Sequence, residues 1–385
     1  MKKSKGEKLK IAIIGAGPAG ALSAYLLSKQ DHQIHLYERN LKTKRKVCGE
    51  YLCPQGIDLL KKYDFYHEIS GLFQLLYGMK IVTPSGIKLT TFFPNDKYGL
   101  SLNRQKFDNF LISKIDPRVQ IKRGQSLVNL EKKQDQWLVK TEQDEQLFDL
   151  VIAADGIHSK VAKILGHSKK SSLERIALHV FLPLKNIRDY QRIGQMHLFQ
   201  DSSYCGLDPI NENEINFSIV CDSEKLKNMR PYEIINHYIH SSEKLTQMFE
   251  LISENSQVST ITPLSKKNTF IAGEGIAYVG DASGFVDPLT GEGIYNALLS
   301  AEILSQNLER SSLDKALREY KLKKKKLSFQ KNLLNHFFQM VIRNPWASHL
   351  IATYLERNQK RANIFIGIIG NIYSPLRGLF KLLSA

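Results

Sequence analysis

Apolar runs, a glycine-rich turn and a helical stretch follow one another near the start of the chain. Residues Ile11–Ile14 form a short continuous apolar run, as in a parallel strand that is buried on both faces. Ala24 and Leu27 follow at helical spacing, and a second apolar run extends from Ile34 to Tyr37. The pattern therefore predicts a complete βαβ unit, in which one helix joins two parallel strands.

The segments that follow mix the patterns of strands and helices. Residues from Tyr77 to Phe93 alternate between apolar and polar around Pro84-Ser85-Gly86, which predicts a β-hairpin. A helix is predicted to begin near Asn103, because Phe107 and Leu111 lie on one apolar face. Three further runs are predicted as strands, the first two antiparallel and the third buried, at residues 119–128, 137–141 and 148–153.

The second half of the chain first changes to β structure and then returns to an α/β pattern. Alternating strands are predicted from Ile176 to Val220, followed by helical structure from Lys225 to Ile252. A buried strand from Gly275 to Val279 then leads to a long helix from Ile294 to Leu308. The last 60 residues are helical and rich in apolar side chains. This order predicts an α/β protein with an inserted β-sheet and a helical C-terminal segment.

Composition and charge narrow the possible functions. The chain has 385 residues, a length that favours two domains, and a net charge of +16. Residues 311–385 hold fourteen Lys and Arg against three Asp and Glu. Such a segment could be a solvated basic face, or it could bind an anionic membrane surface or nucleic acid. No apolar stretch reaches the roughly 18 residues that a membrane span needs, so only peripheral attachment is considered.

Four cysteines, without C-x-x-C spacing, are too sparse for a disulfide scaffold. They indicate a reducing compartment, and we predict a cytoplasmic protein for which peripheral attachment to the membrane stays open.

The glycine-rich turn between the first strand and helix has the form of a dinucleotide-binding fingerprint. Gly15 allows the tight turn, Gly17 lets a pyrophosphate approach the backbone, and Gly20 lets the helix pack closely against the strand. Glu38, at the end of the second strand, is placed to accept hydrogen bonds from a ribose. Strand, helix, strand and acid together predict a dinucleotide site at this helix N-terminus.

Further candidates lie outside the fingerprint. A second glycine-rich helix start runs from Gly280-Asp281 to Gly291-Glu292-Gly293-Ile294, and a ligand could approach its backbone closely. Arg104, in the first turn of a predicted helix, opposes the usual dipole preference, which suggests an anionic partner. Cys48 fits equally a small buried side chain and a functional thiol.

Three motifs occur in the order and approximate spacing of the flavoprotein hydroxylases shaped like p-hydroxybenzoate hydroxylase: the glycine fingerprint, Asp155-Gly156, and Gly280-Asp281 with its glycine-rich helix start. Within that superfamily, the stretch from Gly280 to Tyr295 most resembles the geranylgeranyl reductase family of FAD-dependent oxidoreductases. Lys46-Val47-Cys48-Gly49 supports this resemblance, because that family carries a basic residue followed by Cys-Gly.

The resemblance implies a discontinuous, Rossmann-like FAD-binding domain at residues 8–75, 101–170 and 264–325. An antiparallel β-sheet substrate domain would comprise residues 76–100 and 171–263, and a basic helical segment would comprise residues 326–385. The ADP half of FAD would lie on the fingerprint and Glu38. Arg104 would lie over the pyrophosphate, Asp281 would bind the ribityl chain, and the second helix start would face the flavin. The predicted cofactor-binding residues are Gly15, Gly17, Pro18, Ala19, Gly20, Glu38, Arg39, Arg104, Asp155, Gly280, Asp281, Gly291, Glu292, Gly293 and Ile294.

Two positions depart from the reductase pattern. The counterpart of the family's Tyr-x-Trp-x-Phe-Pro motif is Tyr204–Pro209, where Gly206 replaces Trp and Asp208 replaces Phe. Glu50 stands where the reductases usually have glycine. A pocket that is less aromatic, and possibly more polar, is therefore expected.

The sequence contains no second dinucleotide fingerprint, so NAD(P)H would bind transiently or another carrier would supply the electrons. The predicted function is an FAD-dependent oxidoreductase that reduces a C=C bond of a lipophilic, isoprenoid-like or polyketide-like small molecule by hydride transfer. Cys48 is the first candidate for the proton donor and Glu50 is the second. No metal site is predicted.

An FAD-dependent monooxygenase that uses a C4a-hydroperoxyflavin shares the same motifs and stays open as the alternative. A non-catalytic basic flavoprotein that binds membranes or nucleic acid is a remote third, and nucleic acid is an unlikely partner.

Overall fold

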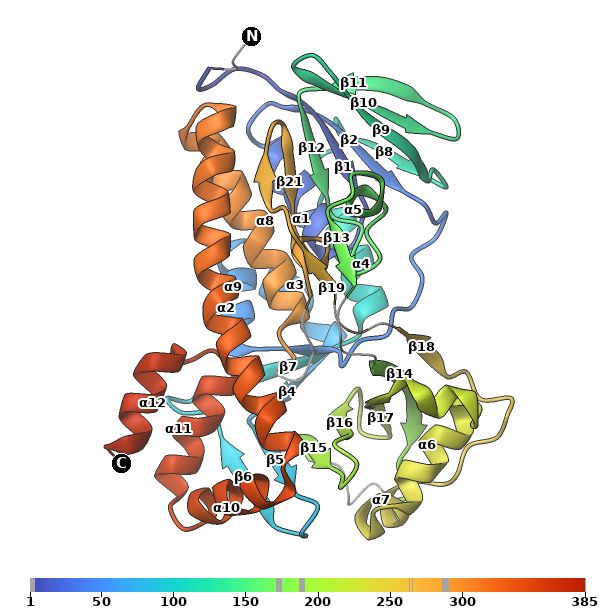
Figure 1. The fold of residues 1–385 in the computed structure, drawn as a ribbon, viewed down its shortest axis with the longest axis vertical. Coiled ribbons are helices and arrows are strands. Elements are labelled where there is room, and N and C mark those ends of the chain that lie inside the picture. The colour runs from blue at the N-terminus through green and yellow to red at the C-terminus, as the bar shows by residue number, and fades with distance from the viewer. Residues whose placement is uncertain are drawn as a thin grey trace.

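The computed structural model describes residues 4–170, 175–186, 191–262, 264, 266–285 and 291–384. The molecule is elongated, with an α/β half that holds the N-terminus and a second half built on a large β-sheet (Figure 1). A long helix runs along one side of both halves. The predicted fold class, α/β with an inserted sheet and C-terminal helices, is confirmed.

The α/β half is organised around a six-stranded sheet. Its strands, in spatial order, are β20 (Ala272–Gly273), β21 (Ile276–Tyr278), β12 (Leu150–Ala153), β1 (Lys10–Ile14), β2 (Gln33–Glu38) and β8 (Gln120–Arg123). All neighbouring pairs are parallel except β20 with β21. Residues 119–128 were predicted as one antiparallel strand, and that prediction is wrong. The segment is divided between β8, which is parallel to β2, and β9 (Leu127–Lys133), which is antiparallel to β10 (Gln136–Thr141).

The two faces of this sheet are covered differently. Ile11 and Ile13 face the helices α1 (Pro18–Ser28) and α8 (Gly293–Arg310), which pack against each other. Ala12 and Ile14 face the helix α5 (Lys160–Ile164) and a small antiparallel sheet made of β9, β10 and β11 (Glu145–Phe148). Because both faces are covered, the central strands are apolar throughout, as the continuous runs predicted.

The second half contains a seven-stranded sheet. Its strands, in spatial order, are β18 (Ser259–Ile261), β14 (Arg175–Pro183), β17 (Glu214–Asp222), β16 (Tyr204–Pro209), β15 (Gly194–Leu198), β5 (Gly78–Val82) and β6 (Lys88–Phe92). Strands β5 and β6 form the predicted hairpin. The pair β15 and β5 is parallel, so the sheet is antiparallel except at this junction. The strands come from within the ranges predicted for the substrate domain, whose boundaries remain a prediction.

One face of the seven-stranded sheet packs on the helices α6 (Pro231–His240) and α7 (Glu243–Met248) through a separate apolar core. The opposite face looks toward the α/β half. The remaining short elements lie outside the two large sheets. These are β3 (Tyr51–Leu52), α2 (Pro54–Lys62), α3 (Phe65–Glu68), η1 (Ser70–Leu72), β4 (Phe73–Leu76), β7 (Gly99–Leu102), α4 (Arg104–Ser113), β13 (Ser168–Lys170), η3 (Ser223–Lys227), β19 (Lys266–Asn268) and η4 (Gly280–Ser283).

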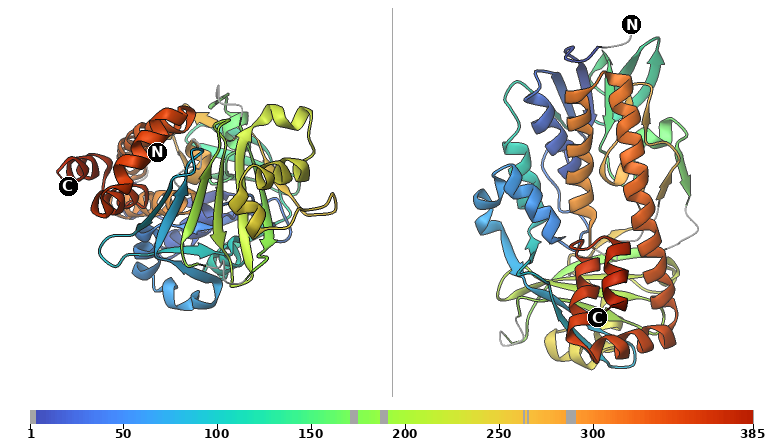
Figure 2. Two further views of the ribbon diagram at one scale, coloured as in Figure 1. Left: turned by 90° about the horizontal axis from the view of Figure 1, so that it is seen from below. Right: turned by 90° about the vertical axis from the view of Figure 1, so that its left-hand side faces the viewer.

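The C-terminal segment is helical, as predicted. Helix α9 (Leu313–Arg343) packs on α8, and its lower end continues into α10 (Pro345–Glu356), α11 (Gln359–Ile369) and α12 (Pro375–Leu383). Figure 2 shows these last helices gathered beside the β5 and β6 edge of the large sheet. Among the helices of the described ranges, none combines the length and apolar character that crossing a membrane requires.

Candidate flavin site

The glycine fingerprint forms a tight turn at the carboxyl end of β1. Gly15 has a φ of +103°, and a Cβ atom built there would lie 2.6 Å from the carbonyl oxygen of Ala154. A Cβ atom at Gly20 would lie 1.9 Å from the carbonyl oxygen of Gly15, so only glycine fits both places. Helix α1 begins after Gly17 without a side-chain cap. Its first-turn N–H groups can therefore meet an anion.

Glu38 lies at the end of β2, beside this turn. Its Oε2 accepts a hydrogen bond from the Ala16 amide at 3.0 Å, and its Oε1 accepts from the backbone and side chain of Asn40. Burial acts to raise the pKa of Glu38, but these hydrogen bonds outweigh it and hold the pKa below its ordinary value. The carboxylate is thus ionised and held at the position predicted for ribose recognition. The predicted neighbour Arg39 has an exposed side chain.

Two other predicted motifs meet the same turn. The Cα atom of Asp155 lies 2.9 Å from a Cβ position at Gly15, and Asp155 Oδ2 accepts hydrogen bonds from Lys160 and Val161 at the start of α5. Asp155 Oδ1 is buried and has no hydrogen-bond partner among the described residues. Gly280 has a φ of +56°, and a Cβ atom built there would lie 3.0 Å from the Cβ atom of Ala19.

Asp281 follows Gly280 in the short helix η4. Burial raises the pKa of Asp281, and the positive charges of Arg104, Lys324 and Lys46 oppose this shift. Asp281 therefore lies in the electric field of Arg104 and Lys46, which belong to two other segments of the chain. The structure brings together motifs that are more than 250 residues apart in the sequence.

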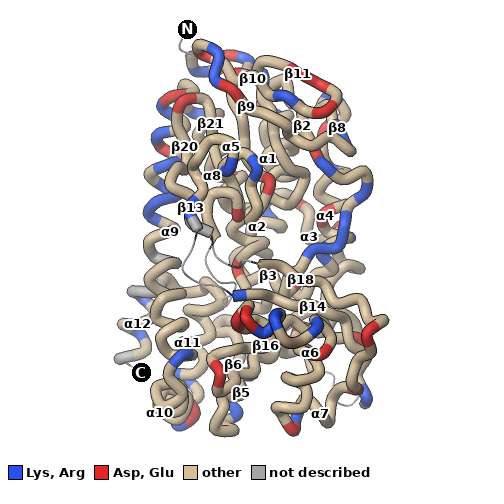
Figure 3. Tube along the Cα trace, turned by 45° about the vertical axis from the view of Figure 1, so that its right-hand side comes forward, with Lys and Arg blue, Asp and Glu red and all other residues tan. Residues whose placement is uncertain are grey.

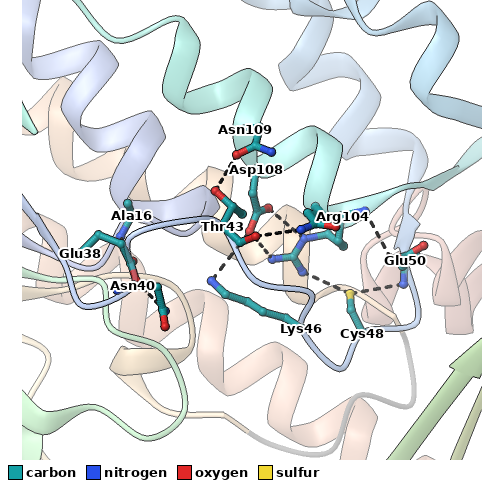
Figure 4. A network of polar contacts seen from close by, with 11 residues as sticks. Ala16, Glu38, Asn40, Thr43, Lys46, Cys48, Glu50, Arg104, Asp108 and Asn109 are labelled. Atoms are coloured by element: carbon teal, nitrogen blue, oxygen red, sulfur yellow. Dashed lines mark hydrogen bonds and ion pairs between the residues drawn. The ribbon is translucent and has the colours of Figure 1, made fainter. Parts of the chain in front are cut away.

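Arg104 is the centre of a polar network (Figure 4). Its Nε donates to Asp108 Oδ1 at 3.1 Å, its Nη1 donates to Cys48 Sγ at 3.2 Å, and its backbone N–H donates to Glu50 Oε1 at 3.3 Å. Lys46 Nζ lies 3.7 Å from Asp108 Oδ2 and also 3.2 Å from a Cβ position at Gly17. Lys46 thus borders the phosphate-binding turn, and the Arg104 side chain pairs with Asp108 on its own helix, so an anionic ligand of Arg104 stays a prediction.

Cys48 and Glu50, the predicted catalytic residues, both belong to this network. Burial raises the pKa of the Cys48 thiol, although the charge of Arg104 lowers it. Glu50 is 1% exposed, its Oε2 has no partner among the described residues, and burial raises its pKa to about 7. Glu50 also has a φ of +58°, the left-handed conformation that glycine adopts most easily.

The second helix start lies against the same loop. Gly291 has a φ of +66°, and a Cβ atom there would lie 2.6 Å from Cδ1 of Tyr51. Helix α8 begins at Gly293 without a side-chain cap, and Glu292 and Ile294 are buried. The part of this motif at residues 286–290 lies outside the described residues. The backbone at Gly291 is therefore next to Tyr51, at the end of the Cys48–Tyr51 loop.

The family model for the FAD binding domain matches residues 8–316, which is most of the chain. The chain belongs to this FAD-binding family. It is 25% identical over 349 residues to digeranylgeranylglycerophospholipid reductase from Methanocaldococcus jannaschii, covering 85% of the chain and 84% of that relative. It is 24% identical over 327 residues to geranylgeranyl diphosphate reductase from Synechocystis, covering 79% of the chain and 76% of that relative.

The fold has solved counterparts as well. A flavoprotein/dehydrogenase from Cytophaga hutchinsonii superimposes with a TM-score of 0.81 at 17% identity, covering 97% of the chain and 95% of that structure. The predicted relationship to the geranylgeranyl reductase family is confirmed, and the protein is an FAD-dependent oxidoreductase.

The residues of the site fit FAD. The uncapped start of α1 and the cations Lys46 and Arg104 suit the pyrophosphate, Glu38 suits the ribose, and Asp281 suits the ribityl hydroxyls. The uncapped start of α8 offers a partial positive charge to the flavin. When bound, FAD supplies hydride transfer. These individual assignments remain predictions.

Two groups on the large sheet extend the site and were not among the predicted site residues. Asn216 on β17 donates from Nδ2 to the backbone carbonyl of Cys48 at 3.0 Å. Asp208 on β16 is the cross-strand partner of Asn216. The sequence had pointed to Asp208 only as a departure from the family motif. The contact with Cys48 joins residues far apart in the chain, and no local pattern could have indicated it.

An apolar pocket lies between the large sheet and the C-terminal helices. Its walls come from β5, β6 and β15 on one side and α9, α10 and α11 on the other, and include Ile81, Leu89, Met196, Leu198, Phe338, Ala352 and Phe365. Met196 is the cross-strand partner of Gly206. The pocket wall therefore includes the cross-strand neighbour of Gly206, the position where the reductase pattern carries Trp.

Proposed function

We propose that the protein reduces a C=C bond in a lipophilic, isoprenoid-like or polyketide-like small molecule, with reduced FAD as the hydride source. The apolar pocket between the large sheet and the C-terminal helices carries this proposal. Its wall includes Met196, the cross-strand partner of Gly206 on β16, and the next strand, β17, contacts the Cys48–Tyr51 loop through the hydrogen bond of Asn216 to Cys48. An apolar chain lying in the pocket would have one end directed toward this loop.

The printed names of the two curated relatives, both reductases of geranylgeranyl compounds, support an isoprenoid-like chain. Chemistry at the loop supports a reduction. Adding a hydride to a C=C bond requires a proton at the other carbon, and a donor must lie within hydrogen-bond reach or one water away. The Cys48 thiol is protonated at neutral pH, because burial raises its pKa.

Cys48 is also equipped to lose that proton. The thiolate left behind would accept hydrogen bonds from Arg104 Nη1 at 3.2 Å and from the Glu50 amide at 3.3 Å. Glu50, whose pKa is about 7, can hold a proton at neutral pH and serve as the second donor. The two groups predicted from the sequence thus have proton affinities that suit the task.

Single-turnover measurements test the proposal. Holoenzyme reduced under anaerobic conditions, with dithionite and separately with NADH or NADPH, is mixed with geranylgeraniol. Reoxidation of the flavin with a gain of two hydrogens in the product is the expected result. Reoxidation only after oxygen is admitted, with a gain of one oxygen in the product, would overturn the proposal in favour of a monooxygenase.

A variant that fills the pocket tests its role. Ala352→Phe places a ring among the pocket walls, whereas Thr353→Phe adds the same ring to the next position of α10, which is not part of the wall. We expect the first variant to slow substrate-dependent reoxidation strongly and the second to leave it near the wild-type rate. Flavin content and thermal stability of both variants control for misfolding.

We further propose that the C-terminal helices attach the protein to an anionic membrane surface, from which a lipophilic substrate could enter. Helix α9 exposes Leu322, Lys326, Phe329, Leu333, Phe337 and Met340 at a spacing of three or four residues, which forms one apolar stripe with a basic residue. Trp346 on α10 and Phe380 on α12 are 70% and 76% exposed. Lys and Arg recur along α9 (Figure 3), and exposed apolar surface beside basic charge suits an anionic bilayer.

A further inference from the structure

The two departures from the reductase pattern, Glu50 and Asp208, are linked through the contact between Asn216 and Cys48. Asp208 and Asn216 are directly opposite each other on β16 and β17, so their side chains lie on one face of the sheet. Asn216 holds the Cys48 carbonyl at 3.0 Å, two residues before Glu50. In keeping with this placement, the charge of Glu50 helps to raise the pKa of Asp208, second to burial.

The space around these groups is open on the sheet side. Gly206 is two residues before Asp208 on the same strand and thus shares its face. A Cβ atom built at Gly206 would meet no atom within 4 Å. Asp208 Oδ1 lies 2.9 Å from a Cβ position at Gly194, so the carboxyl group extends over this glycine of β15. Glycines on two strands therefore leave room beside the Asp208 carboxyl.

Tyr51 completes the arrangement with a hydroxyl group. The Tyr51 side chain is 7% exposed, and its hydroxyl has no hydrogen-bond partner among the described residues. Burial raises the pKa of Tyr51, and the charges of Cys53, Asp208 and Glu292 contribute further, so Asp208 is one of the acidic groups that act on this hydroxyl. A buried hydroxyl without a partner costs roughly 1–3 kcal/mol, which a ligand could recover by bonding to it.

We propose that Glu50, Tyr51 and Asp208 form a polar subsite that binds a hydroxyl group of the substrate next to the reacting double bond. This inference rests on the proposed function and names the substrate class more narrowly, as a lipophilic alcohol. The hydroxyl donates a hydrogen bond to a carboxylate oxygen and accepts one from Tyr51, so both kinds of group are satisfied. The hydrocarbon chain then continues past Gly206 and Met196 into the apolar pocket.

The charges around the subsite decide which polar groups it accepts. Arg45 and Arg104 act on Glu50 as cations and Glu214 acts as an anion. Once the pH is above about 7, where burial has placed the pKa values of Glu50 and Asp208, both acids are carboxylate acceptors, and a substrate carboxylate placed between them would be repelled. A methyl ether could accept from Tyr51 but could not donate to either acid. The subsite should therefore prefer alcohol over ether and over carboxylic acid.

Binding of three probes of one chain length tests the subsite: geranylgeraniol, geranylgeranyl methyl ether and geranylgeranoic acid. The change in flavin absorbance of the oxidised holoenzyme at about pH 9, where both acids are ionised, gives each Kd without turnover. We expect the alcohol to bind at least about tenfold more tightly than the other two, because a hydrogen bond to a charged group is lost in each. Asp208→Phe, which restores the reductase residue, should remove this preference.

Two further variants make the result decisive. Tyr51→Phe keeps the ring that packs on Gly291 and removes only the hydroxyl, so it should reduce the preference even if Asp208→Phe folds poorly. Glu212→Gln, at an exposed position of the turn between β16 and β17, should leave all three affinities unchanged.

Equal binding of alcohol and ether by the wild type, or no binding of either, would overturn the subsite. A preference that survives both Asp208→Phe and Tyr51→Phe would overturn it as well. If the preference is present and sensitive to these variants while the reduced enzyme fails to reduce the alcohol, the proposed function is wrong and the subsite stands.

Discussion

Replacing Glu50 by glutamine should make the stability of the protein less dependent on pH. In the folded protein burial raises the pKa of Glu50 from 4.5 to about 7, against the opposing effects of the Arg104 amide and the Arg45 and Arg104 charges. The folded state therefore binds this proton more tightly than the unfolded state. Its stabilising effect is fully present below about pH 4.5 and is lost as the pH rises through about 7.

The size of the effect follows from the two pKa values. A pKa difference of about 2.5 corresponds to roughly 3 kcal/mol, and the greater part of it, about 2 kcal/mol, falls between pH 5 and pH 8. Glutamine does not titrate. The free energy of unfolding of Glu50→Gln, relative to that of the wild type, should therefore rise by about 2 kcal/mol from pH 5 to pH 8. Because Glu50 is 1% exposed, solvent screening should reduce this figure little.

Urea unfolding of the FAD-saturated protein at pH 5, 6, 7 and 8 measures this difference. The exposed Glu142→Gln is the control and should follow the wild-type profile. Glu50→Gly should in addition gain about 1 kcal/mol at every pH, because glycine adopts a φ of +58° without the steric cost that glutamate bears. Parallel profiles for wild type and Glu50→Gln would refute the conclusion that a buried acid with a raised pKa lies in this loop.

Three other predictions concern the flavin, the proton donor and the membrane. Gly17→Val should abolish FAD binding and leave the apoprotein folded, because a Cβ atom there meets only the flexible end of Lys46. Gly20→Val should instead destabilise the apoprotein itself, by at least about 1–3 kcal/mol. Flavin content after heat release and circular dichroism of the apoproteins distinguish the two variants. Cys48→Ala should retain FAD and slow anaerobic substrate-dependent reoxidation by roughly 10²–10⁴-fold, measured by stopped flow. The fraction of protein that co-sediments with anionic liposomes should fall between 0.1 M and 1 M salt, because the Debye length decreases from about 10 Å to about 3 Å. Phe329→Ser should reduce this fraction, whereas the distant, exposed Leu226→Ser should leave it unchanged.

The α/β core could be predicted from the sequence because its decisive patterns are contiguous. The apolar run at Ile11–Ile14, the glycine turn and the second run at Ile34–Tyr37 are neighbours along the chain, and the structure places them in β1, α1 and β2. The need for glycine in this turn also has a local steric cause. A Cβ atom at Gly20, for example, would lie only 1.9 Å from the carbonyl oxygen of Gly15. Local chemistry was sufficient in this part of the fold.

Long-range pairing could not be predicted in the same way. Strand β8 pairs with β2, more than 80 residues earlier, and its four residues carry no pattern that distinguishes a parallel edge strand from an antiparallel one. The apolar residues of the C-terminal helices posed a similar problem. Helical spacing showed the faces, but only the structure shows that Phe338 and Ala352 line a pocket while Phe329 and Trp346 are exposed.

The position of Glu50 shows why the two departures from the family pattern need a chemical explanation. Glycine would satisfy the backbone at this position without strain, and it would remove a buried carboxyl oxygen that has no partner among the described residues. Glutamate therefore lowers stability in two independent ways, and Asp208 adds a second, half-buried acid whose pKa is raised to about 7. Strain and unsatisfied polar groups of this kind gather where a ligand is bound, because the ligand recovers their cost. A hydroxyl group bound between Glu50, Tyr51 and Asp208 would recover it here, which is why the two departures are better explained by one substrate than by two separate accidents of packing.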